Sequence, residues 1–171
     1  MKQLATVLLF ATVAIAAAAQ TPATPSANPL VTEAKTAFDR VKGNILKAAD
    51  AMPEDAYSFS PTKDERPFLQ VAAHVADAQA GGCSAVKGGD PVKVDAAKAT
   101  TKADLIAKLK ASFDVCEAAF ASATDATATD TSKGRSKLSR FYGLVAHNQE
   151  QYAIMAAYMR QKGVKPPTAQ N

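Results

Sequence analysis

The chain has 171 residues, a formal net charge of +4 and 6% aromatic residues. Its Lys and Arg residues are dispersed among Asp and Glu, and no basic patch with interleaved aromatic residues is present, which argues against a nucleic-acid partner. Without its N-terminal segment the chain retains about 140 to 150 residues, the size of one domain with one hydrophobic core.

The N-terminus has the pattern of a secretory signal peptide. Lys2 gives a positive start, residues 4–17 form an uncharged apolar run, and residues 17–19 offer an A-x-A cleavage site. A membrane anchor is the alternative, but the run is shorter than the roughly 20 residues that span a bilayer. We therefore expect a cleaved signal peptide at 1–19, a flexible leader at 20–28, no stable membrane insertion, and a periplasmic or secreted protein.

Four stretches carry the periodicity of amphipathic helices, with apolar residues at steps of three and four. The first lies between an N-cap at Asn28 and Pro53, the second begins near Pro67 and meets a stop signal at Gly81-Gly82, the third opens at Thr101, and the fourth runs from about Ser136 to Gln161. The most regular stripe is that of the first helix: Val31, Ala34, Phe38, Val41, Ile45, Ala48 and Met52. No strand pattern competes with these helices. The sequence predicts an all-α four-helix bundle over residues 29–167 and a C-terminal tail at 168–171.

The connections between these helices differ in character. Residues 84–100 are rich in Gly and small residues, and we expect a long loop that crosses one end of the bundle. Residues 121–135 are rich in Thr, Ala and Asp, which predicts a mobile segment. The connection after the first helix contains Tyr57 and Phe59 among prolines, so we expect it to pack over the bundle.

Two cysteines, Cys83 and Cys116, lie at the end of the second helix and on the apolar stripe of the third. In an oxidising compartment they are expected to form a structural disulfide that joins these helices. The alternative is a buried apolar residue at Cys116 and a surface thiol at Cys83.

The only two histidines fall where core residues are expected. His147 and Gln151 stand four residues apart and share a helix face, and His74, within an apolar stretch of another helix, can reach the same point. This pattern indicates an internal polar site. Alternatively, these side chains satisfy one another within the core, together with Asn148 or Tyr57. Asn148 itself is expected to be a core polar residue that fixes helix register.

Several segments together resemble the DinB-like family of four-helix bundle proteins. They are residues 53–61, Arg66, residues 71–77, residues 147–152 and residues 158–167. No single segment is specific, but their order and spacing are, and the resemblance covers nearly all of the chain after the signal peptide.

The resemblance implies a divalent metal held by three histidines, one on the second helix and two spaced as H-x-x-x-H on the last. His74 and His147 match the first two positions, whereas Gln151 occupies the third. Imidazole is a good ligand for zinc, nickel or iron, and an amide oxygen is a weaker one. Asp77 and Glu150 are the nearby carboxylates that could supplement this altered site, and Tyr57 could line its mouth.

The resemblance further implies a metal-dependent hydrolase or a thiol-transferase-like enzyme. Because Gln151 departs from the histidine pattern, the alternative is a non-catalytic periplasmic bundle that binds a small-molecule ligand or has a purely structural role, without metal. The sequence is also compatible with a homodimer.

Overall fold

The structure is a computed structural model that describes residues 26–169, so the expected signal peptide and most of the expected leader lie outside the described residues. Within residues 26–169 the fold is all-helical, with no strand, and the predicted fold class is confirmed. The long helices are α1 (Pro29–Ala51), α2 (Phe68–Lys87), α3 (Lys102–Ala121) and α5 (Lys137–Gln161). The short elements are α4 (Asp125–Thr129) and three 3-10 turns, η1 (Glu54–Ala56), η2 (Ala96–Lys98) and η3 (Pro167–Ala169).

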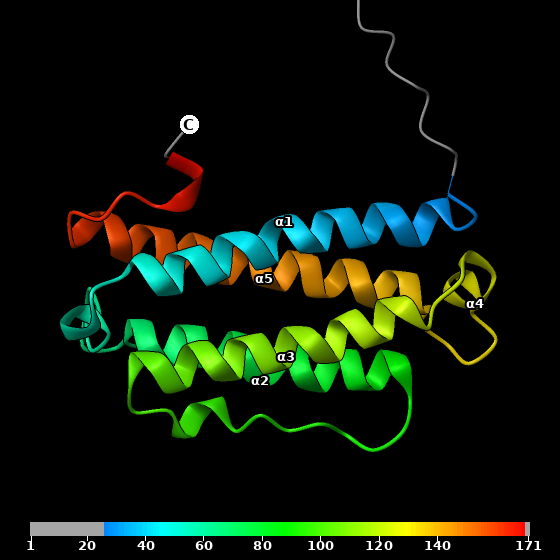
Figure 1. The fold of residues 1–171 in the computed structure, drawn as a ribbon, viewed down its shortest axis with the longest axis horizontal. Coiled ribbons are helices and arrows are strands. Elements are labelled where there is room, and N and C mark those ends of the chain that lie inside the picture. Colours follow the sequence, from blue (N-terminus) through cyan, green and yellow to red (C-terminus); the bar gives the residue numbers. More distant parts are fainter. Residues whose placement is uncertain (1–25, 170–171) are drawn as a thin grey trace, which may run out of the picture.

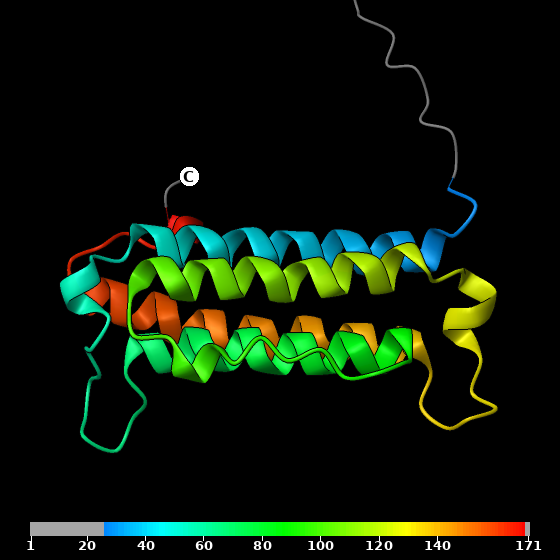
Figure 2. The same cartoon turned by 60° about the horizontal axis from the view of Figure 1, so that its bottom comes forward.

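The four long helices lie side by side, with α1 and α5 running in one direction and α2 and α3 in the other (Figures 1 and 2). α2 packs mainly against α3 and α1 mainly against α5, while α2 also faces α5. Two parallel neighbours such as α2 and α3 need a connection that returns along the whole bundle. The loop predicted to cross one end therefore runs lengthwise beside α2, through η2, and that expectation was wrong.

The core is built from the predicted apolar stripes. All seven residues of the first stripe, six in α1 and Met52 directly after it, are buried. Phe38 of α1 lies with its ring centroid 5.2 Å from that of Phe120 on α3, and Phe120 in turn stacks on Phe141 of α5 at 3.8 Å. Each buried aromatic ring of this kind stabilises the fold by roughly 1.5 to 3 kcal/mol through removal of apolar surface from water. These rings join three of the four helices.

α2 is longer than predicted, because Gly81-Gly82 does not end it. The helix continues to Lys87 and ends at Gly88, whose φ of 84° lies in the left-handed region that favours glycine. Gly82 has a packing role instead, since a Cβ at this position would stand 2.6 Å from Cδ2 of Leu144 on α5. The glycine therefore allows close approach of α2 and α5 near the polar site described below.

The connection between α1 and α2 packs over the bundle, as predicted. Tyr57 is 3% exposed, and its hydroxyl donates a hydrogen bond of 2.5 Å to the carbonyl of Ala49. Its ring meets that of Phe68, the first residue of α2, edge to face, and Phe59 meets Tyr158 of α5 in the same way. These contacts hold the start of α2 against both flanking helices.

The segment at residues 121–135, which the sequence predicts to be mobile, contains the short helix α4. Thr124 and Thr127 form a reciprocal capping box at the start of α4. Asp125 accepts hydrogen bonds from the backbone N–H groups of Leu30 (3.1 Å) and Val31 (3.0 Å). The side chain of Asn28 does not cap its own helix but accepts a bond from the N–H of Asp125. α4 thus supplies the N-terminal cap of α1.

The predicted starts of the last two long helices are confirmed by their caps. Thr101 accepts a hydrogen bond from the N–H of Asp104, and Ser136 accepts one from the N–H of Ser139. Beyond α5 the chain turns back, and Thr168, in the expected C-terminal tail, donates its N–H to the hydroxyl of Tyr152.

A disulfide joins Cys83 of α2 to Cys116 of α3, with a Cα–Cα distance of 5.0 Å, so the predicted pair is present. Both cysteines are fully buried. Among residues 26–169, none of the helices combines the length and apolar character that crossing a membrane requires.

Candidate functional site

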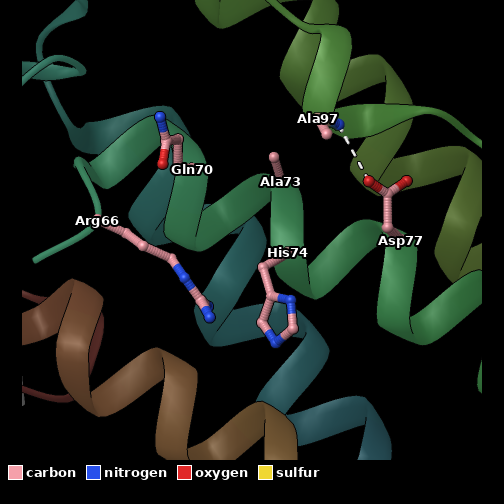
Figure 3. A pocket seen from close by; sticks show the side chains of 6 residues that line it. All are labelled: Arg66, Gln70, Ala73, His74, Asp77 and Ala97. Carbon is pink, nitrogen blue, oxygen red and sulfur yellow. Dashed lines mark hydrogen bonds between the residues drawn. The ribbon is translucent and has the colours of Figure 1, made fainter.

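His74 of α2 and His147 of α5 face each other across the bundle. Their Nε2 atoms lie 3.1 Å apart, and their ring centroids are separated by 5.0 Å with an angle of 66° between the rings. Both residues are partly buried. Two helices far apart in the sequence thus place the Nε2 atoms of His74 and His147 close together. In Figure 3 the ring of His74 projects from α2 beside the side chain of Arg66.

The surroundings of His74 favour its neutral form. Burial lowers the pKa of His74 below its ordinary value, and electrostatic interaction with Arg66 and His147 lowers it further, while Asp77 acts in the opposite direction. A neutral imidazole carries a lone pair on one ring nitrogen, which is the form that binds metals and accepts protons.

A chain of amides continues from His147 into the core. The Nδ1 atom of His147 lies 3.4 Å from Oδ1 of Asn148, and Nδ2 of Asn148 donates a bond of 2.7 Å to Oε1 of Gln79 on α2. Because an amide oxygen only accepts, a hydrogen bond across this 3.4 Å contact requires the proton of His147 on Nδ1, which leaves its lone pair on Nε2, toward His74. His74 then donates its Nε2–H to His147 when nothing lies between the two rings.

Asn148 and Gln79 are both fully buried, as was expected for Asn148. Gln79 was missed by sequence reasoning, although it stands four residues after the buried Val75 and therefore lies on the buried face of α2. The Nε2 atom of Gln79 has no hydrogen-bond partner within the part of the chain that the structure describes. A polar side chain on an apolar stripe was the signal that could have revealed it.

Gln151 lies one turn after His147 on α5 and is partly buried. Within residues 26–169 its side chain makes no hydrogen bond. Glu150, its neighbour in sequence, is exposed.

The other two accessory candidates have structural partners. The carboxylate of Asp77 accepts hydrogen bonds from the backbone N–H groups of Ala96 (2.8 Å) and Ala97 (3.0 Å) at η2, and so holds the long loop onto α2 (Figure 3). Tyr57 is buried against Phe68, with its hydroxyl bonded to Ala49. Burial raises the pKa of Tyr57 well above its usual range, assisted by the charges of Asp50 and Glu54, so its hydroxyl stays protonated.

Comparison with known families identifies the family of the chain. Residues 37–155 match the family model of the DinB superfamily. The chain belongs to the DinB superfamily. The matched range contains both histidines and Gln151, and it spans the four long helices of the DinB protein apart from the outer ends of α1 and α5. A comparison with curated proteins found no match.

The histidine pair of this DinB protein has a spacing that suits a shared divalent ion. Two imidazole nitrogens at about 2.0 to 2.1 Å from one ion, with bond angles near 90 to 110°, stand about 2.9 to 3.4 Å apart. The 3.1 Å between the Nε2 atoms falls within that interval. No group of three or more His, Cys, Asp and Glu side chains in the described residues is arranged to hold a metal.

Proposed function

We propose that this member of the DinB superfamily is an exported metal-dependent enzyme whose divalent ion, zinc, nickel or iron, is held by His74 and His147 with Gln151 as a weaker third ligand. The 3.1 Å separation of the two Nε2 atoms carries the proposal. For both Nε2 atoms to face one ion, His74 and His147 must each carry the ring proton on Nδ1, and the Oδ1 atom of Asn148, 3.4 Å from Nδ1 of His147, favours that form of His147. The altered third ligand predicts weaker binding than a set of three histidines.

The reaction is either hydrolysis or a thiol-transferase-like transfer. A bound divalent ion supplies Lewis acidity, which lowers the pKa of a water or thiol. Hydrolysis also calls for a general base close to the attacking water. Asp77 is engaged by two backbone N–H groups and Glu150 is exposed, so neither is held as such a base. A thiol, with a pKa of about 8.5, depends less on a protein base, which favours the thiol-transferase-like reaction.

Export is supported by the pattern of residues 1–19, and the Cys83–Cys116 disulfide is compatible with an oxidising compartment. The mass of the protein recovered from its producing cells tests this part. Cleavage after Ala19 is the expected result, and a cytoplasmic protein that retains Met1–Ala19 would contradict it.

Metal analysis of the purified mature protein tests the site. After dialysis with zinc, nickel or iron and removal of excess ion, we expect near-stoichiometric metal in the wild type. Loss of metal is expected in His74→Ala and in His147→Ala, because each variant leaves a single imidazole. Gln151→His should lower the Kd by on the order of tenfold or more, because it supplies a third imidazole on the same helix face.

The matched control is Gln149→His, which adds a histidine on α5 at an exposed position two residues from Gln151. It should leave metal affinity unchanged. If neither the wild type nor Gln151→His binds metal while circular dichroism shows the folded bundle, the histidine pair is a hydrogen-bonded core contact. The non-catalytic alternative then replaces the proposal.

A further inference from the structure

An open cleft of about 450 Å³ lies on the outer side of α2, next to the histidine pair. It is lined by Arg66, Gln70, Ala73, His74, Asp77 and Ala97 (Figure 3). Its volume falls in the range of small-molecule sites, which is roughly 300 to 1,000 Å³. His74 belongs both to this cleft and to the histidine pair, so a ligand in the cleft lies against the candidate metal site.

Arg66 supplies the positive charge of the cleft. Its side chain extends from the loop before α2 toward the ring of His74 (Figure 3). Its backbone is held in place, because the hydroxyl of Tyr158 donates a hydrogen bond of 3.2 Å to the carbonyl of Arg66. Within residues 26–169 the guanidinium makes no hydrogen bond and no ion pair. A fork of N–H donors is therefore available to an oxyanion.

The other charged group of the cleft, Asp77, is not a partner for Arg66. Both of its carboxylate oxygens accept backbone N–H groups of η2. Asp77 nevertheless places a carboxylate on the far wall of the cleft, and like charges repel across it. This arrangement suits a ligand with a single negative charge at the Arg66 end more than a dianion. Gln70 also lines the cleft.

We infer that the cleft binds small monoanionic carboxylates, with the carboxylate on the Arg66 guanidinium and the body of the ligand along Ala73 and His74. A planar carboxylate matches the guanidinium fork with two parallel hydrogen bonds. That the carboxylate is the substrate rests on the proposed function, because the part of the ligand beyond Arg66 reacts only if a metal is bound at the histidine pair. That the cleft binds a carboxylate depends only on the cleft and Arg66.

NMR titration of the mature protein tests the inference, with benzoate as the probe and neutral benzamide as its isosteric control. The backbone amide signals of Gln70, Ala73 and His74 should shift with benzoate, with a Kd on the order of millimolar, as expected for one exposed charge-assisted contact. Arg66→Gln should weaken benzoate binding by roughly tenfold and leave the weak response to benzamide unchanged. Arg66→Lys should fall between, because lysine keeps the charge and loses the fork.

Arg140→Gln is the matched control, since Arg140 is an exposed arginine beside a different cleft on α5. It should not alter benzoate binding. Equal responses to benzoate and benzamide, or benzoate binding that survives Arg66→Gln, would overturn the inference. Tighter binding of phenyl phosphate than of benzoate would overturn the choice of a monoanion.

The titration is run on protein as isolated and again after chelator treatment. Arg66-dependent benzoate binding after chelation supports the cleft even if no metal is ever found. If the protein binds stoichiometric metal but does not bind benzoate, the carboxylate site is contradicted and the metal proposal is not.

Discussion

At the residue scale, the polar side chains between α2 and α5 form one continuous series of contacts. It runs from Gln79 through Asn148 and His147 to His74, and so begins in the fully buried core and ends at the cleft. Each amide sets the hydrogen-bonding role of its neighbour. Asn148 orients His147, and Gln79 orients Asn148, so two core residues with no ligand contact determine which nitrogen of His147 is available.

The buried Asn148–Gln79 bond can be tested by removing one partner or both. Asn148→Leu should lower the free energy of unfolding by about 2 to 3 kcal/mol, because it leaves both polar ends of Gln79 buried and unpaired. The double variant Asn148→Leu/Gln79→Met removes both polar groups at similar volume and should be more stable than Asn148→Leu. Urea unfolding of the four proteins in this cycle measures the coupling.

Additive effects of the two substitutions would show that the amides do not depend on each other. If the coupling is present, the double variant should also bind metal more weakly than the wild type despite its recovered stability, since His147 has lost its Nδ1 acceptor. Metal affinity therefore distinguishes a role of Asn148 in orienting His147 from a role in core packing alone.

The meeting of His74 with His147 was predictable, because a lone polar residue on each of two apolar stripes points to the same interior. The partner of Asn148 was not predicted, since Gln79 lies within an alanine-rich stretch where the apolar pattern is shallow. The role of Asp77 was also not predicted, nor was the hydrogen-bond partner of Tyr57, although the packing of the Tyr57 loop over the bundle was. Their partners are backbone groups of Ala96, Ala97 and Ala49, and backbone donors and acceptors carry no residue-type signal.

At the element scale, α1 begins on a cap that comes from another part of the chain. A helix start leaves unpaired N–H groups, and Asp125 of α4 pairs two of them. Sequence reasoning placed the start of α1 correctly at Asn28 and Pro29 but assigned the cap to Asn28. The actual cap is about 95 residues away in sequence, and local spacing rules for capping do not extend that far.

Asp125→Ala should lower the free energy of unfolding by about 1 to 2 kcal/mol, as expected for loss of an N-cap that also carries a favourable negative charge. Hydrogen exchange should show faster opening at Leu30 and Val31, with little change at the centre of α1. Asp114→Ala is the matched control, because Asp114 is an exposed carboxylate on α3. Equal effects of the two substitutions would mean that the α4 cap contributes nothing specific.

At the scale of the whole molecule, the four long helices were predictable and their arrangement was not. Strong periodicity and capping residues locate each helix within a few residues, apart from the end of α2. The parallel pairing of α2 with α3 depends on a long return loop, and loop length alone does not tell whether the chain crosses an end or runs along a side. The role of Gly82 was likewise not predictable, because in the sequence a glycine that permits close helix packing cannot be distinguished from one that ends a helix.

The Cys83–Cys116 disulfide is the covalent link that holds this arrangement. It closes a loop across a sequence separation of 33 residues, which includes the whole return loop and η2. The loss of chain entropy in the unfolded state corresponds to about 3 to 4 kcal/mol for a loop of this size. A domain of this length has a total free energy of unfolding of only about 5 to 15 kcal/mol, so the disulfide contributes a large share of it.

Cys83→Ala/Cys116→Ala should therefore unfold at a distinctly lower urea concentration, with a loss of about 3 to 4 kcal/mol. Its urea dependence should also be steeper, because the unfolded chain without the link exposes more surface. Reductant should bring the wild type close to the variant and leave the variant unchanged. A variant as stable as the oxidised wild type would contradict the loop-closure account, and an effect of reductant on the variant would show that the reagent acts elsewhere.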